Sequence, residues 1–447
     1  MPITYNPDTN TITVVGFSEE EPCTFEDIYN ASVANNWGVV DKLDASTYIF
    51  RAKLQIGDGS TWTYFADKEK TVIFTSDVTL DYHEAVILVK RHAYLWLGEC
   101  DEETRTGCKG VTLIVRDVVF NAYAFVIHNE PEGEIRLGGT ELIGKRSELG
   151  HMLWLEDDSV NKIWSCRIVG GLGAVKMTNN LDVNELVIQN AGHGWMYGTT
   201  PEHPITNVIV ECCSDGAYIY STNPLYLSNA RFMRNYYTIN TIDLASAPRF
   251  TDCEADRWRI NWGGTPTEDA RIERAYTFKV RVTDKDGNPI ENALVELYDK
   301  NGNLVFAELT GPDGEISEHS IVSITYTPTE TIDNNPYTVK ISKEGFTPLE
   351  AIVTIDRPMK NLVWPLDALK HTLDEIYDAL TAHDADVKAE LDDLERGRKV
   401  LTNRWKIENN QLVIYDDDGV TPLLRFNLKD KYGNPSEVNV YEREPVE

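Results

Sequence analysis

Acidic side chains in the middle of the chain could cleave a glycosidic bond if two of them met. The candidates are Glu211 and Asp215, four residues apart, and the adjacent Asp157 and Asp158. Glycoside hydrolysis uses one carboxyl group as an acid and a second as a nucleophile or base, about 5–10 Å apart. No sequence pattern separates these four from the other acids of a chain whose formal charge is −30. We therefore assign no catalytic residue and favour a protein without enzymatic activity.

Aromatic residues recur in four aligned segments that could hold a sugar. The segments GAVKMTNN, HGWMYGTT, GAYIYSTN and YYTINTID place Trp195 and Tyr218 in one column and Tyr197 and Tyr220 in a second. Two interpretations remain open. The rings form an internal ladder, or they form an exposed platform on which the apolar face of a sugar lies.

These residues belong to a stretch, residues 115–255, that repeats a six-residue phrase. We call this stretch the repeat region. Its first and sixth positions are almost always apolar, and its copies start 22, 26, 20, 22, 22 and 23 residues apart. The seven copies are VRDVVF (115), LGGTEL (137), IWSCRI (163), VNELVI (183), ITNVIV (205), LSNARF (227) and FTDCEA (250). A constant period in this range is typical of a solenoid.

The spacing inside the phrase predicts the kind of solenoid. Positions four and six share one face of a strand, whereas position one joins them only if the chain bends. A strand, a bend and a second strand every ~22 residues indicate a right-handed parallel β-helix. Glu185 and Asp252 occupy the same third position three rungs apart, or ~14 Å, which is too far for paired carboxylates. Glu254 is a further outward acid.

Length, charge and cysteine content limit the function. A chain of 447 residues is long enough for several domains, and its negative charge argues against nucleic acid and anionic membranes as partners. The start MPITYNPDTN lacks the features of a signal peptide, and no apolar run reaches the ~20 residues of a membrane span. We expect no cofactor, no metal and no membrane insertion. Cys100 and Cys108 could pair, but two free thiols fit cytoplasmic synthesis better.

The expected fold class is mainly β, in five segments. Residues 1–70 form an N-terminal cap or lead-in. They include a short helix that Thr24 caps, with Asp27 three residues later. Residues 71–268 form the β-helix, and the Gly-rich stretch INWGGTPTEDARIE links it to a β-sandwich at 274–357. Residues 362–400 form a coiled-coil helix and 401–447 a small C-terminal β tip. The Asp-rich turns of the sandwich fit hairpins better than calcium loops.

The helical segment carries a narrow apolar seam in heptad spacing, with Pro365 at its start. Such a seam favours a coiled coil, and a helix packed on its own chain is the alternative. The expected oligomerisation residues are Leu366, Leu369, Leu373, Ile376, Leu380, Val387, Leu391 and Leu394. Because the tip is too small to hold a core alone, three copies around one axis would supply it.

The segment 274–357 resembles a known sandwich family. VTDKDGNPIENALVELYD, TGPDGEIS and YTVKISKEGFTP are similar to carboxypeptidase regulatory-like, or transthyretin-like, domains. The resemblance implies a β-sandwich that acts as a spacer or an adhesive module, in a family without a shared active site.

The tail and the lead-in resemble parts of viral proteins. Residues 401–404, 415–419, 421–423, 426–430, 433–435 and 440–443 resemble a C-terminal module of structural proteins of tailed phages and archaeal tailed viruses. FEDIYNASVANNWGVV and IGDGSTWTYFADKEKTVIF resemble lead-ins to phage β-helices.

These resemblances imply a homotrimeric tail or head fibre or spike, located in the virion after assembly in the host cytoplasm. Its expected partners are itself, other virion proteins and a host-surface glycan or receptor. A tailspike that depolymerises polysaccharide, as a glycosidase or lyase, is the alternative.

Overall fold

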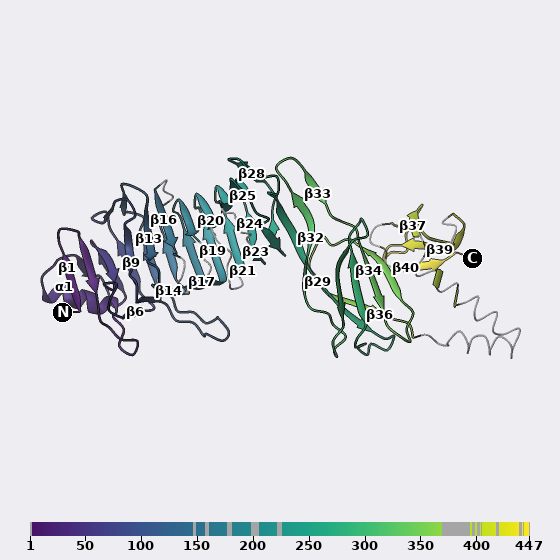
Figure 1. The fold of residues 1–447 in the computed structure, drawn as a ribbon, viewed down its shortest axis with the longest axis horizontal. Coiled ribbons are helices and arrows are strands. Elements are labelled where there is room, and N and C mark those ends of the chain that lie inside the picture. Colours follow the sequence, from purple (N-terminus) through teal and green to yellow (C-terminus); the bar gives the residue numbers. More distant parts are fainter. Residues whose placement is uncertain are drawn as a thin grey trace, which may run out of the picture. The chain divides into compact units, whose positions relative to one another are not determined.

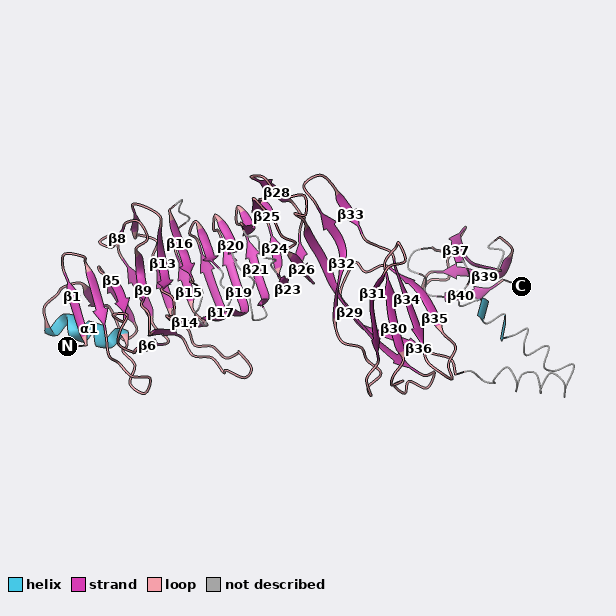
Figure 2. Cartoon of the chain, viewed as in Figure 1, coloured by secondary structure: helices cyan, strands magenta, loops and turns pink. Residues whose placement is uncertain are grey.

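The fold was obtained as a computed structural model. It describes residues 2–145, 149–156, 161–176, 181–197, 205–220, 226–368, 394–395, 398–399, 403, 405–416, 420–437, 440 and 442–446. The chain divides into two compact units, and each is described by itself. Unit 1 comprises Met1–Glu344 and Pro348–Leu366, and unit 2 comprises Gly345–Thr347 and Asp367–Glu447. With 53% of the described residues in strands and 4% in helices, the fold class is mainly β (Figure 2).

The N-terminal part of unit 1 contains the helix that the sequence predicts. Helix α1 (Phe25–Ala34) follows Thr24, whose side chain accepts a hydrogen bond from the backbone of Asp27 while the Asp27 carboxylate accepts one from Thr24. This reciprocal capping box satisfies amide groups that the first helical turn leaves free. Phe25 and Ile28 are fully buried against the neighbouring strands, so the helix is fixed to the sheets that follow.

Two long sheets run through the lead-in and the repeat region (Figure 1). The first long sheet contains, in spatial order, β1 (Ile3–Asn6), β2 (Thr11–Val14), β5 (Lys53–Ile56), β9 (Ala85–Val89), β13 (Ala124–Asn129), β16 (Gly150–Trp154), β18 (Gly173–Lys176), β20 (His193–Tyr197), β22 (Asp215–Ile219), β25 (Tyr237–Ile242) and β28 (Ile260–Gly263).

The second long sheet has a main path and a side path. The main path is β3 (Val40–Lys42), β4 (Thr47–Phe50), β7 (Thr71–Phe74), β11 (Thr112–Ile114), β15 (Glu141–Ile143), β17 (Asn161–Val169), β19 (Leu181–Gln189), β21 (Ile205–Glu211), β24 (Arg231–Met233) and β27 (Glu254–Ala255). The side path joins β6 (Thr63–Asp67), β10 (Ala93–Leu97) and β14 (Glu134–Gly138) to β17, and β8 (Thr79–Leu80) pairs with β12 (Val119–Phe120) outside both sheets.

Successive copies of the phrase pair in parallel and in register. The first-position residues Leu137, Ile163, Val183 and Ile205 are direct partners along the sheet. The sixth-position column is continuous as well, through Leu142, Ile168, Ile188, Val210, Phe232 and Ala255. The predicted register of these copies is therefore confirmed, and the buried columns form one apolar core.

The bend that the phrase requires lies at its third position. The residues there have left-handed backbone angles, with φ between 53° and 63°. They are Gly139, Ser165, Glu185, Asn207, Asn229 and Asp252. A single residue in this conformation turns the chain between two strands, so side chains three positions apart can both point inward.

The prediction was wrong for the first copy. Val115 does not join the first-position column, because Leu97 is the partner of Leu137, and Leu113 rather than Phe120 is the partner of Leu142. The residues between Leu97 and Leu113 form an inserted loop, which breaks the spacing of the phrase at this rung.

The inserted loop also corrects the prediction of two free thiols. Cys100 and Cys108 form a disulfide, because the bridge between Glu99 and Lys109 brings the two ends of the loop together. Arg105 fastens the loop through an ion pair of 3.0 Å with Asp182. The cysteines at position four of the phrase, Cys166 and Cys253, are buried free thiols.

The predicted linker after the repeat region is instead part of the fold. β29 (Ile272–Thr283) pairs through its first residues with β26 (Arg249–Thr251) and through its last residues with β36 (Met359–Pro365). One strand therefore belongs to both the repeat region and the sandwich. The other members of this junction sheet are β23 (Tyr226–Ser228), β32 (His319–Tyr326) and β33 (Thr331–Asp333).

The second sheet of the sandwich is antiparallel, with the order β31 (Leu304–Leu309), β30 (Leu294–Tyr298), β34 (Tyr337–Ser342) and β35 (Leu349–Val353). Val280, Val282, Val295 and Leu297 are buried in the sandwich. Its Asp-rich turns are hairpin turns, because the Asp284 carboxylate accepts hydrogen bonds from the backbone at 286 and 288. Asp299 makes the same contacts in the turn that follows.

The segment 362–400 departs from the prediction at its start. Residues up to Pro365 belong to strand β36, and Leu366 is buried in unit 1, where its amide donates to the carbonyl of Thr283. Leu366 therefore cannot serve as an oligomerisation residue on a helix. The backbone at 394–395 and 398–399 is helical and Leu394 is 53% exposed. The predictions for Leu369, Leu373, Ile376, Leu380, Val387 and Leu391 lie outside the described residues.

Unit 2 contains an antiparallel sheet, the terminal sheet. Its strands are β37 (Trp405–Glu408), β38 (Gln411–Tyr415), β39 (Pro422–Lys429) and β40 (Glu442–Pro445). Asn409 and Asn410, both with positive φ, form the turn between β37 and β38. Val413 is fully buried.

Candidate functional site

Glu211 belongs to a row of polar side chains along the second long sheet. Its carboxylate accepts hydrogen bonds from Gln189 and, at 2.6 Å, from Arg234. Gln189 in turn accepts one from Arg167 at 2.9 Å, and Arg167 pairs with Glu141. The hydrogen bonds from Gln189 and Arg234 lower the pKa of Glu211, so this group stays ionised and is not a proton donor.

Asp215 lies in the first long sheet with different partners. Its Oδ2 is 2.5 Å from Nδ1 of His193 and accepts a hydrogen bond of 3.0 Å from Asn240. The Asp215 side chain is only 5% exposed, whereas that of His193 is 23% exposed. The two candidate carboxylates, Glu211 and Asp215, are therefore held by separate partners in separate sheets.

The contact with Asp215 orients the ring of His193. A carboxylate at Nδ1 sets the tautomer of an imidazole and allows the other nitrogen to accept a proton. Tyr218 lies against the same ring, with 4.2 Å between ring centroids. The sequence signal for this contact is the separation of 22 residues between His193 and Asp215, which equals the period of the repeat; that signal was not used to single out His193.

Glu156 is a carboxylate that the sequence analysis did not single out. It lies near Nε2 of His128 at 3.4 Å, accepts a hydrogen bond of 2.7 Å from the Trp154 indole, and pairs with Lys176 at 3.4 Å. These neighbours, His128 first, lower the pKa of Glu156 to about 2 against the opposing effect of burial. Asp157 and Asp158, the next two residues, lie outside the described part of the chain.

Glu156 and Asp215 are too far apart to act as a pair. Glu156 follows β16 by two residues and Asp215 begins β22, and β18 and β20 lie between these strands, so they are three strand spacings apart. At ~4.8 Å per rung the separation is ~14 Å, beyond the reach of paired carboxylates in a glycosidase.

The remaining outward acids have structural partners. Glu185 accepts a hydrogen bond of 2.7 Å from Ser165, and Glu254 pairs with Arg231 at 3.3 Å. Asp252 accepts a hydrogen bond from the Thr277 backbone at 2.7 Å and pairs with Lys360 at 3.2 Å.

The aromatic residues do not form the columns that the aligned segments predicted. Trp195 is fully buried, and its sheet partners are Val175 and Ala217, not Tyr218. An enclosed indole cannot receive a sugar, so Trp195 is a core residue. The one-residue difference in register turns Tyr218 outward beside His193, and Tyr220 is 39% exposed. The Tyr197 side chain lies outside the described residues.

Another aromatic cluster lies on β6 and β10. Tyr64 and Tyr94 stack almost in parallel, 4.4 Å apart, and Trp62 stacks on His92 at 4.8 Å. Because stacked rings cover one another's faces, this cluster behaves as a ladder that joins rungs and not as a sugar platform. Alternating aromatic residues in STWTYFA and AYLWL are the sequence signal for it.

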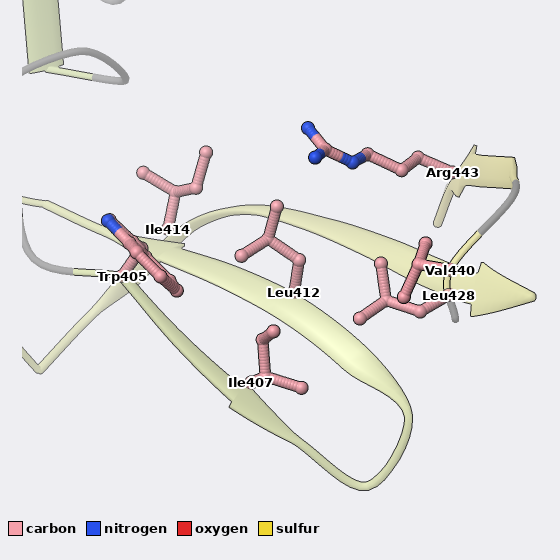
Figure 3. Close-up of a pocket in the computed structure, with 7 residues that line it drawn as sticks. All are labelled: Trp405, Ile407, Leu412, Ile414, Leu428, Val440 and Arg443. Atoms are coloured by element: carbon pink, nitrogen blue, oxygen red, sulfur yellow. The ribbon is translucent and has the colours of Figure 1, made fainter. Parts of the chain in front are cut away.

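The terminal sheet of unit 2 carries an open apolar groove. Figure 3 shows its lining side chains on one side of the sheet, with Arg443 at the rim. The groove encloses about 350 Å³ and is lined by Trp405, Ile407, Leu412, Ile414, Leu428, Val440 and Arg443. Trp405 is 63% exposed and Ile407 39%. The groove therefore exposes part of an apolar sheet face within the described part of unit 2.

No group of three or more His, Cys, Asp or Glu side chains among the described residues is placed to hold a metal ion. In the same residues, no helix has the length and apolar character needed to cross a membrane. The sequence matches no protein-family model and no curated protein.

Proposed function

We propose that this chain is a subunit of a virion fibre or spike that attaches to a host surface or decorates the particle. In this proposal the two long sheets are faces of a right-handed parallel β-helix, which acts as a stiff shaft. The observation that carries it is the in-register parallel pairing of successive copies, each turned by one left-handed residue at the third position. Each rung covers the core of the rung before it, which suits an extended protein.

The flanking regions support the same proposal. The helix and hairpin at the N-terminus cover the first rung, and β29 carries the last rung directly into the sandwich. The sandwich resembles transthyretin-like spacer modules, and the last 47 residues resemble tail modules of viral structural proteins. Virion localisation and partnership with other virion proteins follow from those resemblances.

The terminal sheet supports a homotrimer. Four strands with one apolar face exposed are too small to hold a core, and three copies around an axis would cover that face. We identify the groove around Trp405 as the place where the copies meet.

The location of the chain tests the function. Virus particles from infected source cells, purified on a density gradient, should contain the chain in stoichiometric amounts, and antibody labelling should find it on a projection. Recovery only in the soluble extract of uninfected cells contradicts the proposal.

A second candidate function is depolymerisation of an anionic polysaccharide. The observation that favours it is the His193–Asp215 pair beside Tyr218, because such a histidine could remove a proton from a uronate. Incubation of the purified protein with capsular polysaccharides should then release unsaturated uronates, and His193→Gln should abolish the release. Absence of product across a broad panel, or equal activity of the variant, eliminates this function.

A further inference from the structure

An open groove lies where the second long sheet turns into the first, over three successive rungs. Its walls come from the turns around 213–214, 234–236 and 256–259, and it encloses about 600 Å³. This volume is within the 300–1,000 Å³ typical of ligand sites. The lining residues that matter here are Ser214, Arg234, Tyr236, Asp256, Arg257 and Arg259.

The charge of the groove is opposite to that of the chain. Three arginines face it, whereas the nearby carboxylates are Asp256 in the wall and Glu211 behind Arg234. Three cations against two anions leave a positive site on a protein whose formal charge is −30. Arg234 forms an ion pair of 2.6 Å with Glu211. Among the described residues, Arg257 and Arg259 form no ion pair.

Arg259 is held in place without losing its charge. Its guanidinium lies 4.2 Å from the ring centroid of Tyr236 and 4.7 Å from that of Tyr237, and it donates a hydrogen bond of 3.3 Å to the Tyr236 hydroxyl. Stacking on tyrosine rings fixes the plane of a guanidinium, so its remaining N–H groups are ready to bind a carboxylate or sulfate.

We propose that this groove binds the carboxylate or sulfate groups of an anionic polysaccharide. The inference rests on the proposed attachment function and names its ligand class. Tyr236 is 59% exposed next to the guanidinium of Arg259, which combines an apolar ring surface with a cation, as a charged sugar requires. Nucleic acid carries more charge per unit length than these polysaccharides, so the negative remainder of the chain repels it more strongly.

Binding measured by calorimetry at low salt tests the proposal. The probes are polygalacturonate and chondroitin sulfate, with neutral dextran and inorganic sulfate for comparison. The purified full chain should bind at least one of the two anionic polymers and not dextran. Arg257→Gln with Arg259→Gln should weaken binding at least tenfold, and Tyr236→Ala about threefold, because Arg259 then loses its orientation.

A matched control separates this groove from general charge. Arg116→Gln with Arg357→Gln removes the same charge at exposed positions elsewhere, and should change binding less than twofold. Equal weakening by both double variants, binding of dextran, binding of inorganic sulfate alone, or no binding of either polymer overturns the proposal. Circular dichroism confirms that each variant is folded. The location of the chain on particles does not depend on this result, so the two proposals fail separately.

Discussion

The repeat region and the terminal sheet differ in how far they bury their apolar side chains. In the repeat region Ile163, Val183 and Ile188 are fully buried on parallel strands that pair in register. In the terminal sheet Trp405 is 63% exposed and Val440 37%. The apolar residues of the repeat region are therefore covered within the chain, whereas in the described part of unit 2 the apolar face of the terminal sheet is partly open; the proposed trimer would cover that face.

The largest effect should come from opening the core of the repeat region. Trp195→Ala removes a fully buried indole between Val175 and Ala217, and should lower the free energy of unfolding by about 3–5 kcal/mol. Urea denaturation measures the change. Tyr236→Ala, at an exposed position of the same region, is the control and should leave stability nearly unchanged. A loss below about 1 kcal/mol for Trp195→Ala would contradict a closed core.

Acid should weaken the repeat region selectively. Burial, with smaller effects of His193 and Lys176, lowers the pKa of His151 from 6.5 to about 3. His151 in the folded state therefore resists protonation. Its contribution to the free energy of unfolding is fully present above pH 6.5 and is lost as the pH falls toward 3. The slope is at most about 1.4 kcal/mol per pH unit, which gives about 2 kcal/mol between pH 6.5 and 5.

The variant His151→Gln isolates this contribution. Its stability should change less than that of the wild type over the same pH range, as followed by thermal unfolding. Glu156, with a pKa near 2, adds to the loss only below its ordinary value of 4.5. The terminal sheet has no histidine and serves as the internal reference. If the stability of the variant and that of the wild type fell equally with pH, His151 would be excluded as the cause of the loss.

Substitution in the terminal sheet should change assembly and leave the repeat region intact. Trp405→Ser removes apolar surface that the proposed trimer buries, which costs about 2 kcal/mol per copy. Light scattering should give about 150 kDa for the wild type and the 50.6 kDa of one chain for the variant, with an unchanged urea midpoint. Tyr432→Ser, which is exposed outside the groove, is the control. A wild-type mass near 50.6 kDa refutes the trimer.

The smallest effect concerns a feature that both regions share. Asn229 in the repeat region and Asn410 in the terminal sheet have positive φ, which a β-branched residue adopts poorly. Asn229→Val and Asn410→Val should each cost about 1–2 kcal/mol in their own region, whereas the glycine variants should be neutral. Unfolding midpoints of the four proteins give the answer. Equal midpoints for valine and glycine would show that these bends are not strained.

The sequence predicted those features that depend on periodic contacts. Columns such as Leu142–Ile168–Ile188 and the capping box of Thr24 follow from spacing alone. The position of Val115 in the repeat was predicted wrongly, because an inserted loop shifts the phrase. The helical position of Leu366 was predicted wrongly, because the apolar residues before it form strand β36 and not the start of a helix. Contacts between side chains that lie far apart in the sequence were harder to predict.

The candidate site depends on such contacts. Neither the His193–Asp215 contact nor the stacking of Arg259 on Tyr236 has a local signal, since each depends on how the rungs align. Glu211 and Asp215 were candidates because they are close in sequence, but their carboxylates have separate partners in separate sheets.

Strand β29 has a mechanical consequence. Its first residues are hydrogen-bonded to β26 and its last residues to β36, so no free segment separates the repeat region from the sandwich. Any bending at this point must break backbone hydrogen bonds. A fragment that starts at residue 274 would lack the first residues of β29, which pair with β26. The junction therefore has no hinge, and a torque applied to the sandwich passes into the rungs through a continuous backbone.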